Sequence, residues 1–217
     1  MKLAPLRLAT VAAFTLAPLL TLGATAPAAV SAAVSAAGQT INYQVRASAL
    51  GQTAELVLTQ DVDSTAPASV APGGALKVTI DPAPNTVPSS GGGYQIREIK
   101  TVALKMPIPA NSTFVSASVS GGSGLGTTPP SIAREGNDVV LKVAGPLKGG
   151  AAFELPTVTI DLTAGSSGKI ESKLGGTSYD APGLTFTAVI IALGFPVNAP
   201  SVAYPNPSPV LTSTTIG

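Results

Sequence analysis

Apolar and polar residues alternate one by one along most of this chain after residue 40. Successive side chains of a β-strand point to opposite faces, so this period of two is typical of strands with one buried and one solvated face. The segments with this pattern are 41–48, 54–60, 76–81, 95–106, 113–120, 139–144, 157–163, 169–174 and 184–193. Because one face of each strand is polar, the pattern favours antiparallel sheets over buried parallel ones.

Turn-forming residues separate these segments and argue against long helices. The chain has 20 Pro and 23 Gly among 217 residues. Proline lacks an amide donor and glycine loses more backbone entropy on folding, so both break helices. Residues 134–138 are predicted to form a hairpin turn in which Gly136 or Asn137 takes a positive φ. The chain is therefore predicted to be all-β, as an antiparallel β-sandwich that is immunoglobulin-like or related, with a β-barrel as the alternative.

The first residues have the order of a secretory signal. Lys2 and Arg7 precede an apolar run over residues 8–22, and small residues follow. This order predicts a signal peptide over residues 1–28, with cleavage at the Ala26-Pro27-Ala28 triplet. A transmembrane anchor is the alternative, but the run is short for a span and contains a proline.

The rest of the chain divides by composition into three parts. Residues 29–38 are Ala-rich and are expected to be a spacer without a fold of its own. Residues 39–195 carry the strand pattern and are expected to form the β-sandwich domain. Residues 196–217 contain five prolines. Because proline cannot donate to a β-ladder, this segment is expected to be an edge strand or extended coil.

Composition excludes several classes of function. The chain has no His and no Cys, which removes the usual proton shuttle at neutral pH, thiolate nucleophiles and the commonest zinc ligands. After loss of Lys2 and Arg7, ten basic residues face eleven acidic ones. This balance gives no reason to expect a nucleic-acid partner. No stable transmembrane helix is expected once the signal is removed.

Acidic residues supply the first candidates for a site. Asp61 and Asp63 share one face of an extended segment and could begin a calcium site, which needs six or more oxygen ligands. They match no complete calcium loop, so a solvated strand end is the preferred interpretation. Four of the five glutamates of the mature chain, with its aspartates, could supply the carboxylate pair of a glycosidase. Aromatic platforms for a sugar are few, so this interpretation is not favoured. These glutamates are Glu98, Glu135, Glu154 and Glu171.

Three further features are interpreted as structural. Residues 121–126 are Gly-rich but match neither a phosphate-binding loop nor a nucleophile elbow, so a flexible loop is expected. The sequence Asn111-Ser112-Thr113 is expected to be a turn that enters a strand. The tyrosines are expected to pack in the core or at its rim; they are Tyr43, Tyr94, Tyr179 and Tyr204. No catalytic, cofactor-binding or metal-binding residue is therefore predicted.

Four longer segments, taken together, carry a family resemblance: 82–88, 104–113, 155–163 and 199–209. The chain resembles a family of exported, β-rich actinobacterial proteins of unknown function, whose members often carry automatic labels such as "cyclase" or "dehydratase". The resemblance covers most of residues 40–217. It implies an exported β-rich domain in the cell envelope or the medium and implies no established reaction.

The resemblance also implies a contact between the two ends of the domain. Members of the family often carry one Cys in the first strand and one just before the Pro-rich segment. Those positions are Val45 and Ala203 in this sequence. The resemblance therefore implies that the strand around residues 43–47 lies beside residues 202–204, with the Pro-rich segment packed on the first strand.

These observations lead to one preferred function and two alternatives. The preferred one is an exported, non-catalytic β-sandwich protein of the cell envelope or medium that serves as a binding or structural module, with cell-wall or envelope components as partners. One alternative is a carboxylate-dependent hydrolase that acts on glycan or lipid. The other is an envelope β-barrel, which needs strands of about ten residues with alternating lipid-facing side chains. Residues 95–106 approach this length, but residues 97–100 break the pattern.

Overall fold

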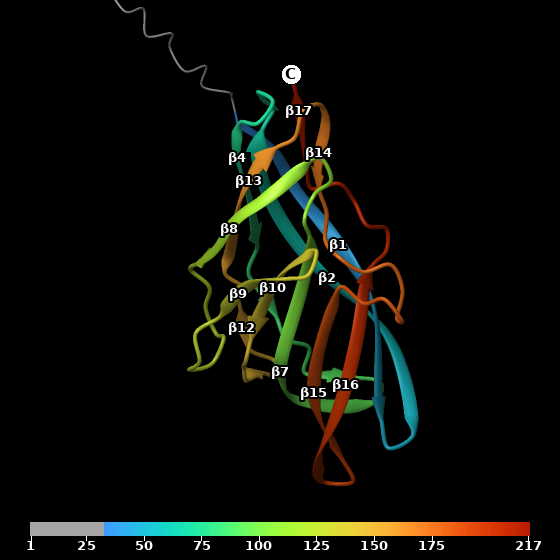
Figure 1. Cartoon of the computed structure of the whole chain (residues 1–217). Helices are drawn as coiled ribbons and strands as arrows, with labels where there is room; N and C mark the ends of the chain where they lie inside the picture. Colours follow the sequence, from blue (N-terminus) through green and yellow to red (C-terminus); the bar gives the residue numbers. More distant parts are fainter. Residues whose placement is uncertain (1–32) are drawn as a thin grey trace, which may run out of the picture. The chain divides into compact units, whose positions relative to one another are not determined.

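The computed structural model describes residues 33–217, with side chains from Gly38 onward. Every regular element in this range is a β-strand, which confirms the all-β prediction (Figure 1). The sandwich and the barrel are both compatible with the large antiparallel sheet. The predicted signal peptide, residues 1–28, lies outside the described residues.

The strands vary from two to seventeen residues in length. They are β1 (Ala33–Ala49), β2 (Gln52–Pro67), β3 (Ser69–Val70), β4 (Ala75–Pro82), β5 (Asn85–Thr86), β6 (Ser90–Gly91), β7 (Tyr94–Pro107), β8 (Ser112–Ser120), β9 (Ser131–Glu135), β10 (Asp138–Val143), β11 (Leu147–Lys148), β12 (Ala152–Phe153), β13 (Thr157–Ala164), β14 (Gly168–Ser172), β15 (Leu184–Ala192), β16 (Phe195–Pro205) and β17 (Thr212–Ile216).

One large sheet organises the fold. Its strand order is β8-β13-β4-β2-β1-β16-β15-β7-β10-β9, and the short strands β6 and β11 also pair with β7. The pairing within it is antiparallel, as expected from the alternating pattern. The two ends of this path, β8 and β9, lie in contact, so the sheet curls around its inner face. Two small sheets complete the fold: β12-β5, and β14-β17-β3, in which β17 and β3 run parallel.

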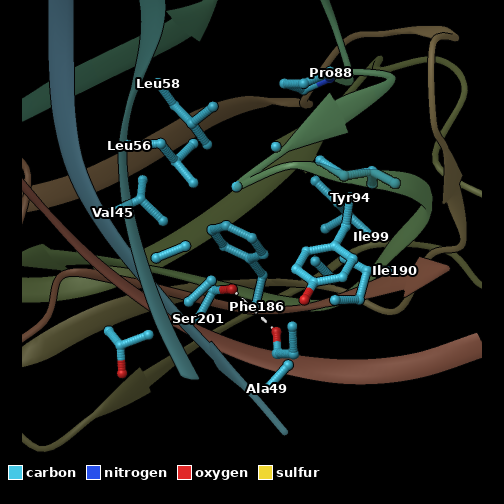
Figure 2. A pocket seen from close by; sticks show the side chains of 18 of the residues that line it. Val45, Ala49, Leu56, Leu58, Pro88, Tyr94, Ile99, Phe186, Ile190 and Ser201 are labelled. Atoms are coloured by element: carbon cyan, nitrogen blue, oxygen red, sulfur yellow. Dashed lines mark hydrogen bonds between the residues drawn. The ribbon is translucent and has the colours of Figure 1, made fainter. Parts of the chain in front are cut away.

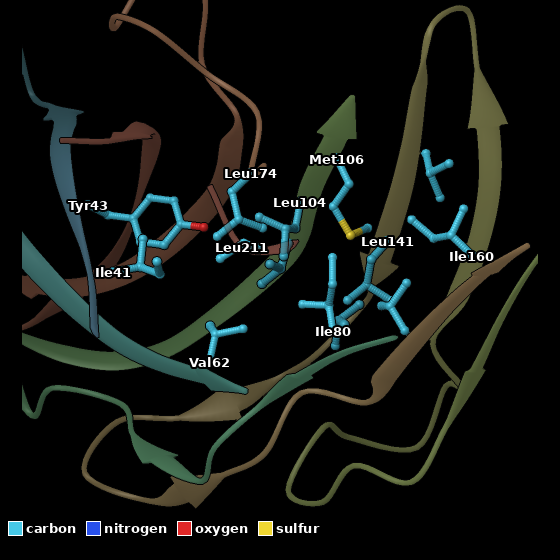
Figure 3. Close-up of a cluster of buried hydrophobic side chains, with 14 of the residues drawn as sticks. Ile41, Tyr43, Val62, Ile80, Leu104, Met106, Leu141, Ile160, Leu174 and Leu211 are labelled. Atoms are coloured by element: carbon cyan, nitrogen blue, oxygen red, sulfur yellow. The ribbon is translucent and has the colours of Figure 1, made fainter. Parts of the chain in front are cut away.

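The inner face of the curled sheet holds one hydrophobic core (Figure 3). Met106 on β7, Leu141 on β10 and Ile80 on β4 are almost completely buried there. Burying an aliphatic side chain of this size stabilises a fold by about 1.5–3 kcal/mol. The apolar residues that alternate along the second half of β7 face this core, with Val102 and Leu104 beside Met106.

The predicted hairpin turn at residues 134–138 is present. Strands β9 and β10 pair with Glu135 opposite Asp138, so Gly136 and Asn137 form a two-residue turn. Gly136 takes a φ of 63°. Two-residue hairpin turns commonly need a positive φ, which glycine adopts without steric cost.

The expected spacer of residues 29–38 differs from the structure. Strand β1 begins at Ala33, and its residues Ala33 to Ala36 pair with Ser64 to Pro67 of β2. The physical reason is the length of β2, which runs for 16 residues and offers β1 a pairing edge beyond the core. Composition alone does not reveal such an edge.

The Pro-rich segment also differs from the expectation of an edge strand or coil. Strand β16 lies inside the sheet, between β1 and β15. Pro196 and Pro200 pair with β15 alone, and Pro205 pairs with β1 alone. The strand has a partner on both sides only from Ser201 to Ala203, which contains no proline. Each proline therefore has a side on which no ladder donor is needed, and this reconciles the composition with an internal position.

The first strand and the Pro-rich segment are direct neighbours. Strands β1 and β16 pair antiparallel from Tyr43–Pro205 to Ala47–Ser201, and Val45 lies opposite Ala203. Both side chains are fully buried. The contact that the sequence resemblance implied is thus present in the register of the sheet.

Candidate functional site

Inward-facing side chains become smaller toward one end of the sheet. Along β1, Ile41, Tyr43 and Val45 face inward and are buried, and Ala47 and Ala49 follow in the same phase. Ala188 on β15 and Ala199 on β16 are the corresponding small residues of neighbouring strands. Side chains this small do not fill the space inside the curled sheet. A cavity remains at this end.

The first part of the cavity has a volume of about 290 Å³. It lies between the β1–β2 hairpin and strands β7, β15 and β16 (Figure 2). Leu56 and Leu58 of β2 point into it from one side, and Phe186 and Ile190 of β15 from the other. Tyr94, at the start of β7, also lines it and is 39% exposed.

A second part, also of about 290 Å³, continues the first. The two parts share Leu58, Pro88, Ile99 and Phe186, which form a waist between them. The second part reaches toward the core and is lined there by Tyr43 and Leu174. Pockets of about 300–1,000 Å³ with apolar walls are typical of small-molecule sites. The two parts together make an elongated site of this kind.

Tyr43 brings a polar group to this apolar interior. Its side chain is 4% exposed and lines the second part of the cavity. Burial raises its pKa well above the ordinary value of about 10, because the phenolate would lose its hydration there. Tyr43 is therefore a neutral hydrogen-bond donor and acceptor at the wall of the second part.

The first half of β2, which lines the cavity, has a strand partner on one side only. β4 pairs with β2 only from Val62 to Thr65, so Gln52 to Gln60 has β1 as its single neighbour in the sheet. The loop before β7 closes against this free edge. A Cβ atom on Gly92, whose φ is 58°, would lie 2.9 Å from the Cβ of Ala54. Only glycine lets the loop approach so closely.

No charged side chain lines either part of the cavity within the described chain. Two of its polar lining residues, Asn85 and Gln60, are already engaged in hydrogen bonds. The Asn85 side-chain amide donates to the Thr59 carbonyl (2.8 Å) and to Gln60 Oε1 (3.0 Å), and Gln60 donates to the Ala83 carbonyl (2.7 Å). The walls therefore suit an uncharged, apolar occupant.

The acidic candidates from the sequence lie elsewhere. Asp61 and Asp63 are exposed on one face of β2, and the Thr40 hydroxyl donates to Asp61. Within residues 38–217 no group of three or more acidic residues could hold a metal ion. Glu98, Glu135 and Glu171 lie on β7, β9 and β14, and each pairs with a nearby cation. The backbone of Glu154 pairs with that of Ser123.

The Gly-rich loop is more constrained than the sequence suggested. The Ser123 amide donates to the Glu154 carbonyl (3.0 Å), and the Glu154 amide donates back (2.9 Å). Leu125 is buried in the core, and a Cβ atom on Gly126 would lie 2.3 Å from the Gly145 carbonyl oxygen. These glycines allow close packing of backbones. The expectation of a free, flexible loop is replaced by a packed connection.

The remaining sequence features lie as follows. Asn111, with a φ of 61°, forms the turn that enters β8, as predicted. Tyr43 packs in the core and Tyr94 at the rim of the cavity. Tyr179 and Tyr204 meet edge to face at 5.1 Å, with the Arg46 guanidinium 3.9 Å from the Tyr179 ring centre. Solvent loss and the nearby Glu55 carboxylate raise the pKa of Tyr179.

Sequence reasoning did not identify the cavity or its lining. The sequence did contain one indication of a cavity, in the residues that face inward on the strands. Alanine occupies inward positions at Ala47, Ala49, Ala188 and Ala199, where other strands carry Leu, Ile or Val. A run of small residues on one inner face indicates missing volume. The pattern does not show which strands face each other across the gap.

Comparisons with known proteins show a fold relationship and no family. No protein-family model matches the chain. No curated protein matches it either. A solved structure from Corynebacterium diphtheriae, provisionally described as a membrane-anchored protein, is similar with a TM-score of 0.53 and 14% sequence identity. The similarity covers 86% of this chain and 38% of that one. Within residues 33–217 there is no helix long and apolar enough to span a membrane.

Proposed function

We propose that this chain is an exported, non-catalytic binding module of the cell envelope, and that its ligand is an extended apolar molecule such as a lipid acyl chain. The observation that carries this proposal is the elongated apolar cavity between β1–β2 and β7–β15. The Tyr43 hydroxyl offers one polar contact at the inner part, which would favour a ligand with a polar group on its chain.

The shape of the cavity favours a chain over a compact molecule. The waist of Leu58, Pro88, Ile99 and Phe186 divides two similar volumes. A flexible chain can pass such a waist and contact both parts, whereas a rigid bulky ligand would fill only one. Each methylene group that leaves water contributes about 0.8 kcal/mol to binding.

The absence of catalysis is supported by where the acid–base groups lie. General acid–base chemistry needs a titratable side chain within hydrogen-bond reach of the substrate. The chain has no His or Cys, and the carboxylates of the described chain lie outside the cavity. Tyr43 does line the cavity, but burial raises its pKa, so its hydroxyl group holds its proton at neutral pH. Turnover of a glycosidase or esterase substrate that disappears on substitution of one carboxylate would contradict this part of the proposal.

The envelope location is supported by the leader-like start of the sequence and by the neighbour from Corynebacterium, which is provisionally described as membrane anchored. The chain spans about 38% of that protein, so the comparison supports a compartment and no specific role. N-terminal sequencing of the secreted form is expected to find a start between Ala24 and Gly38. A mature protein that begins at Met1 would contradict export.

Ligand binding is tested by filling the cavity. Ala188→Leu adds side-chain volume to the first part, whereas Ala103→Leu makes the same change on the outer face of β7. With a fatty acid that carries an environment-sensitive fluorophore, Ala188→Leu is expected to weaken binding by roughly tenfold or more, since overpacking costs about 1–3 kcal/mol. Ala103→Leu should bind like the wild type. Equal affinities for all three proteins would refute the cavity as the site.

A further inference from the structure

Two hairpins at one end of the sheet have the same tripeptide at the turn. Ala49-Leu50-Gly51 joins β1 to β2, and Ala192-Leu193-Gly194 joins β15 to β16. Leu50 and Gly51 have φ values of 52° and 72°, and Leu193 and Gly194 have 51° and 81°. Positive φ at both central residues defines a type I′ turn, for which Asn-Gly is the favoured sequence.

Leucine is an unfavourable choice at these turns for two reasons. Its Cβ atom opposes a left-handed backbone, so the folded conformation is strained at Leu50 and Leu193. Both side chains are also exposed, Leu193 at 93% and Leu50 at 61%, and the adjacent Phe195 is exposed at 71%. These residues therefore stabilise the fold neither through their backbone conformation nor through burial of their side chains. Contact with an apolar surface outside the molecule would explain why apolar side chains occupy these positions.

The two turns lie at the same end of the molecule. Strands β1 and β16 are antiparallel neighbours, so the end of β1 and the start of β16 point the same way. Figure 1 shows both hairpins projecting at this end, where the β15–β16 hairpin extends farther. The first part of the cavity reaches this end, because its lining includes Ala49 and Ala54 of one hairpin and Ile190 of the other.

The charge and the area of the surface formed by Leu50, Leu193 and Phe195 indicate what it can contact. Residues 47–54 and 181–217 contain no charged side chain. Insertion of these turns into hydrocarbon therefore desolvates no ionised group. A second copy of the chain is a poorer partner. Even at about 200 Å² each, three side chains offer less than the roughly 800 Å² per partner of a stable interface.

We propose that the two Leu-Gly turns insert Leu50, Leu193 and Phe195 into a lipid surface and hold this end of the cavity against it. The contact is that of a protein that lies on a membrane, with a few apolar side chains at the depth of the upper acyl chains. It does not depend on whether the cavity is occupied.

A single tryptophan can report this insertion. The chain contains no Trp, so Phe195→Trp places one indole beside the β15–β16 turn. With phosphatidylcholine vesicles that carry brominated acyl chains, its emission is expected to shift to the blue and to be quenched. Val115→Trp is the matched control, because Val115 is 59% exposed on β8, the first strand of the sheet's path, whereas both hairpins belong to strands in the middle of that path. Its emission should not change. Equal quenching at both positions, or none at either, would overturn the proposal.

Substitution of the turns gives an independent readout. The double variant Leu50→Asp/Leu193→Asp is expected to lower vesicle binding on the order of tenfold or more, because two leucines are lost from the lipid contact. Val115→Asp should bind like the wild type. Binding of the fluorescent fatty acid without vesicles should stay unchanged in the double variant, which separates this proposal from the cavity. Unchanged vesicle binding would refute the lipid contact. A blue shift of Phe195→Trp that grows with protein concentration without vesicles would assign the turns to self-association instead.

Discussion

Tyr43 is the residue whose titration most directly reports the interior. Burial raises its pKa in the folded chain, so the folded state holds this proton more tightly than the unfolded state does. The resulting stability is fully present below about pH 10 and is lost as the pH rises from there toward the folded pKa. We expect the free energy of unfolding to fall in this range by up to about 1.4 kcal/mol per pH unit from this one group.

The part of this pH dependence that comes from Tyr43 should disappear when its hydroxyl group is removed. Denaturant unfolding of Tyr43→Phe between pH 8 and pH 11 is expected to show a shallower pH dependence than the wild type. Tyr94→Phe removes an exposed tyrosine and serves as the control. If Tyr43→Phe retained the wild-type slope, Tyr43 would not be shielded from water as described.

The residue pair Val45 and Ala203 tests the register of strands β1 and β16. Directly opposed residues of antiparallel strands have Cα atoms about 4.5–5.5 Å apart, which is within the range of a disulfide. Val45→Cys/Ala203→Cys is expected to form the bond on oxidation without competition, since the chain has no other Cys. Loop closure suggests a gain of about 4–5 kcal/mol, often less because of strain. Two thiols that stay reactive to a labelling reagent after oxidation would contradict the register.

At the scale of elements, the hairpin turns are expected to be less stable than they could be. Asn tolerates a left-handed backbone better than Leu does. Leu50→Asn and Leu193→Asn should each raise the free energy of unfolding by about 1 kcal/mol in denaturant titrations. Leu50→Ala, which leaves a Cβ in the same conformation, is the control and should give no such gain. Destabilised Asn variants would mean that the leucines pack on the protein itself.

The strands show which elements a sequence can predict. Alternation correctly located β4, β10 and β13, because each has a core on one face and solvent on the other. It missed β16, because its prolines suggest an edge strand. In the structure β16 is internal, but it has a partner on both sides over only three residues, none of which is proline. It also missed two-residue strands such as β5 and β11, which are too short for any periodicity. Pairing of such elements depends on tertiary contacts.

At the scale of the molecule, the fold class followed from the sequence and the site did not. The alternation of apolar and polar residues shows which side chains face inward, and it identifies the alanines on the inner faces of the strands. The curvature of the sheet and the meeting of β2 with β15 across the interior come from contacts distant in sequence. The cavity is a product of this closure. Its lining therefore could be named only once the strands were placed.

If an apolar chain occupies this interior, the affinity for straight-chain fatty acids must depend on their length. By titration calorimetry, affinity is expected to rise about fourfold per added methylene, which is about 0.8 kcal/mol, until the chain fills both parts of the cavity. Beyond that length the affinity should level off, and Ala188→Leu should move this limit to a shorter chain while Ala103→Leu leaves it in place. Affinity that does not depend on chain length, or a limit that Ala188→Leu does not move, would show that an apolar chain does not occupy the cavity.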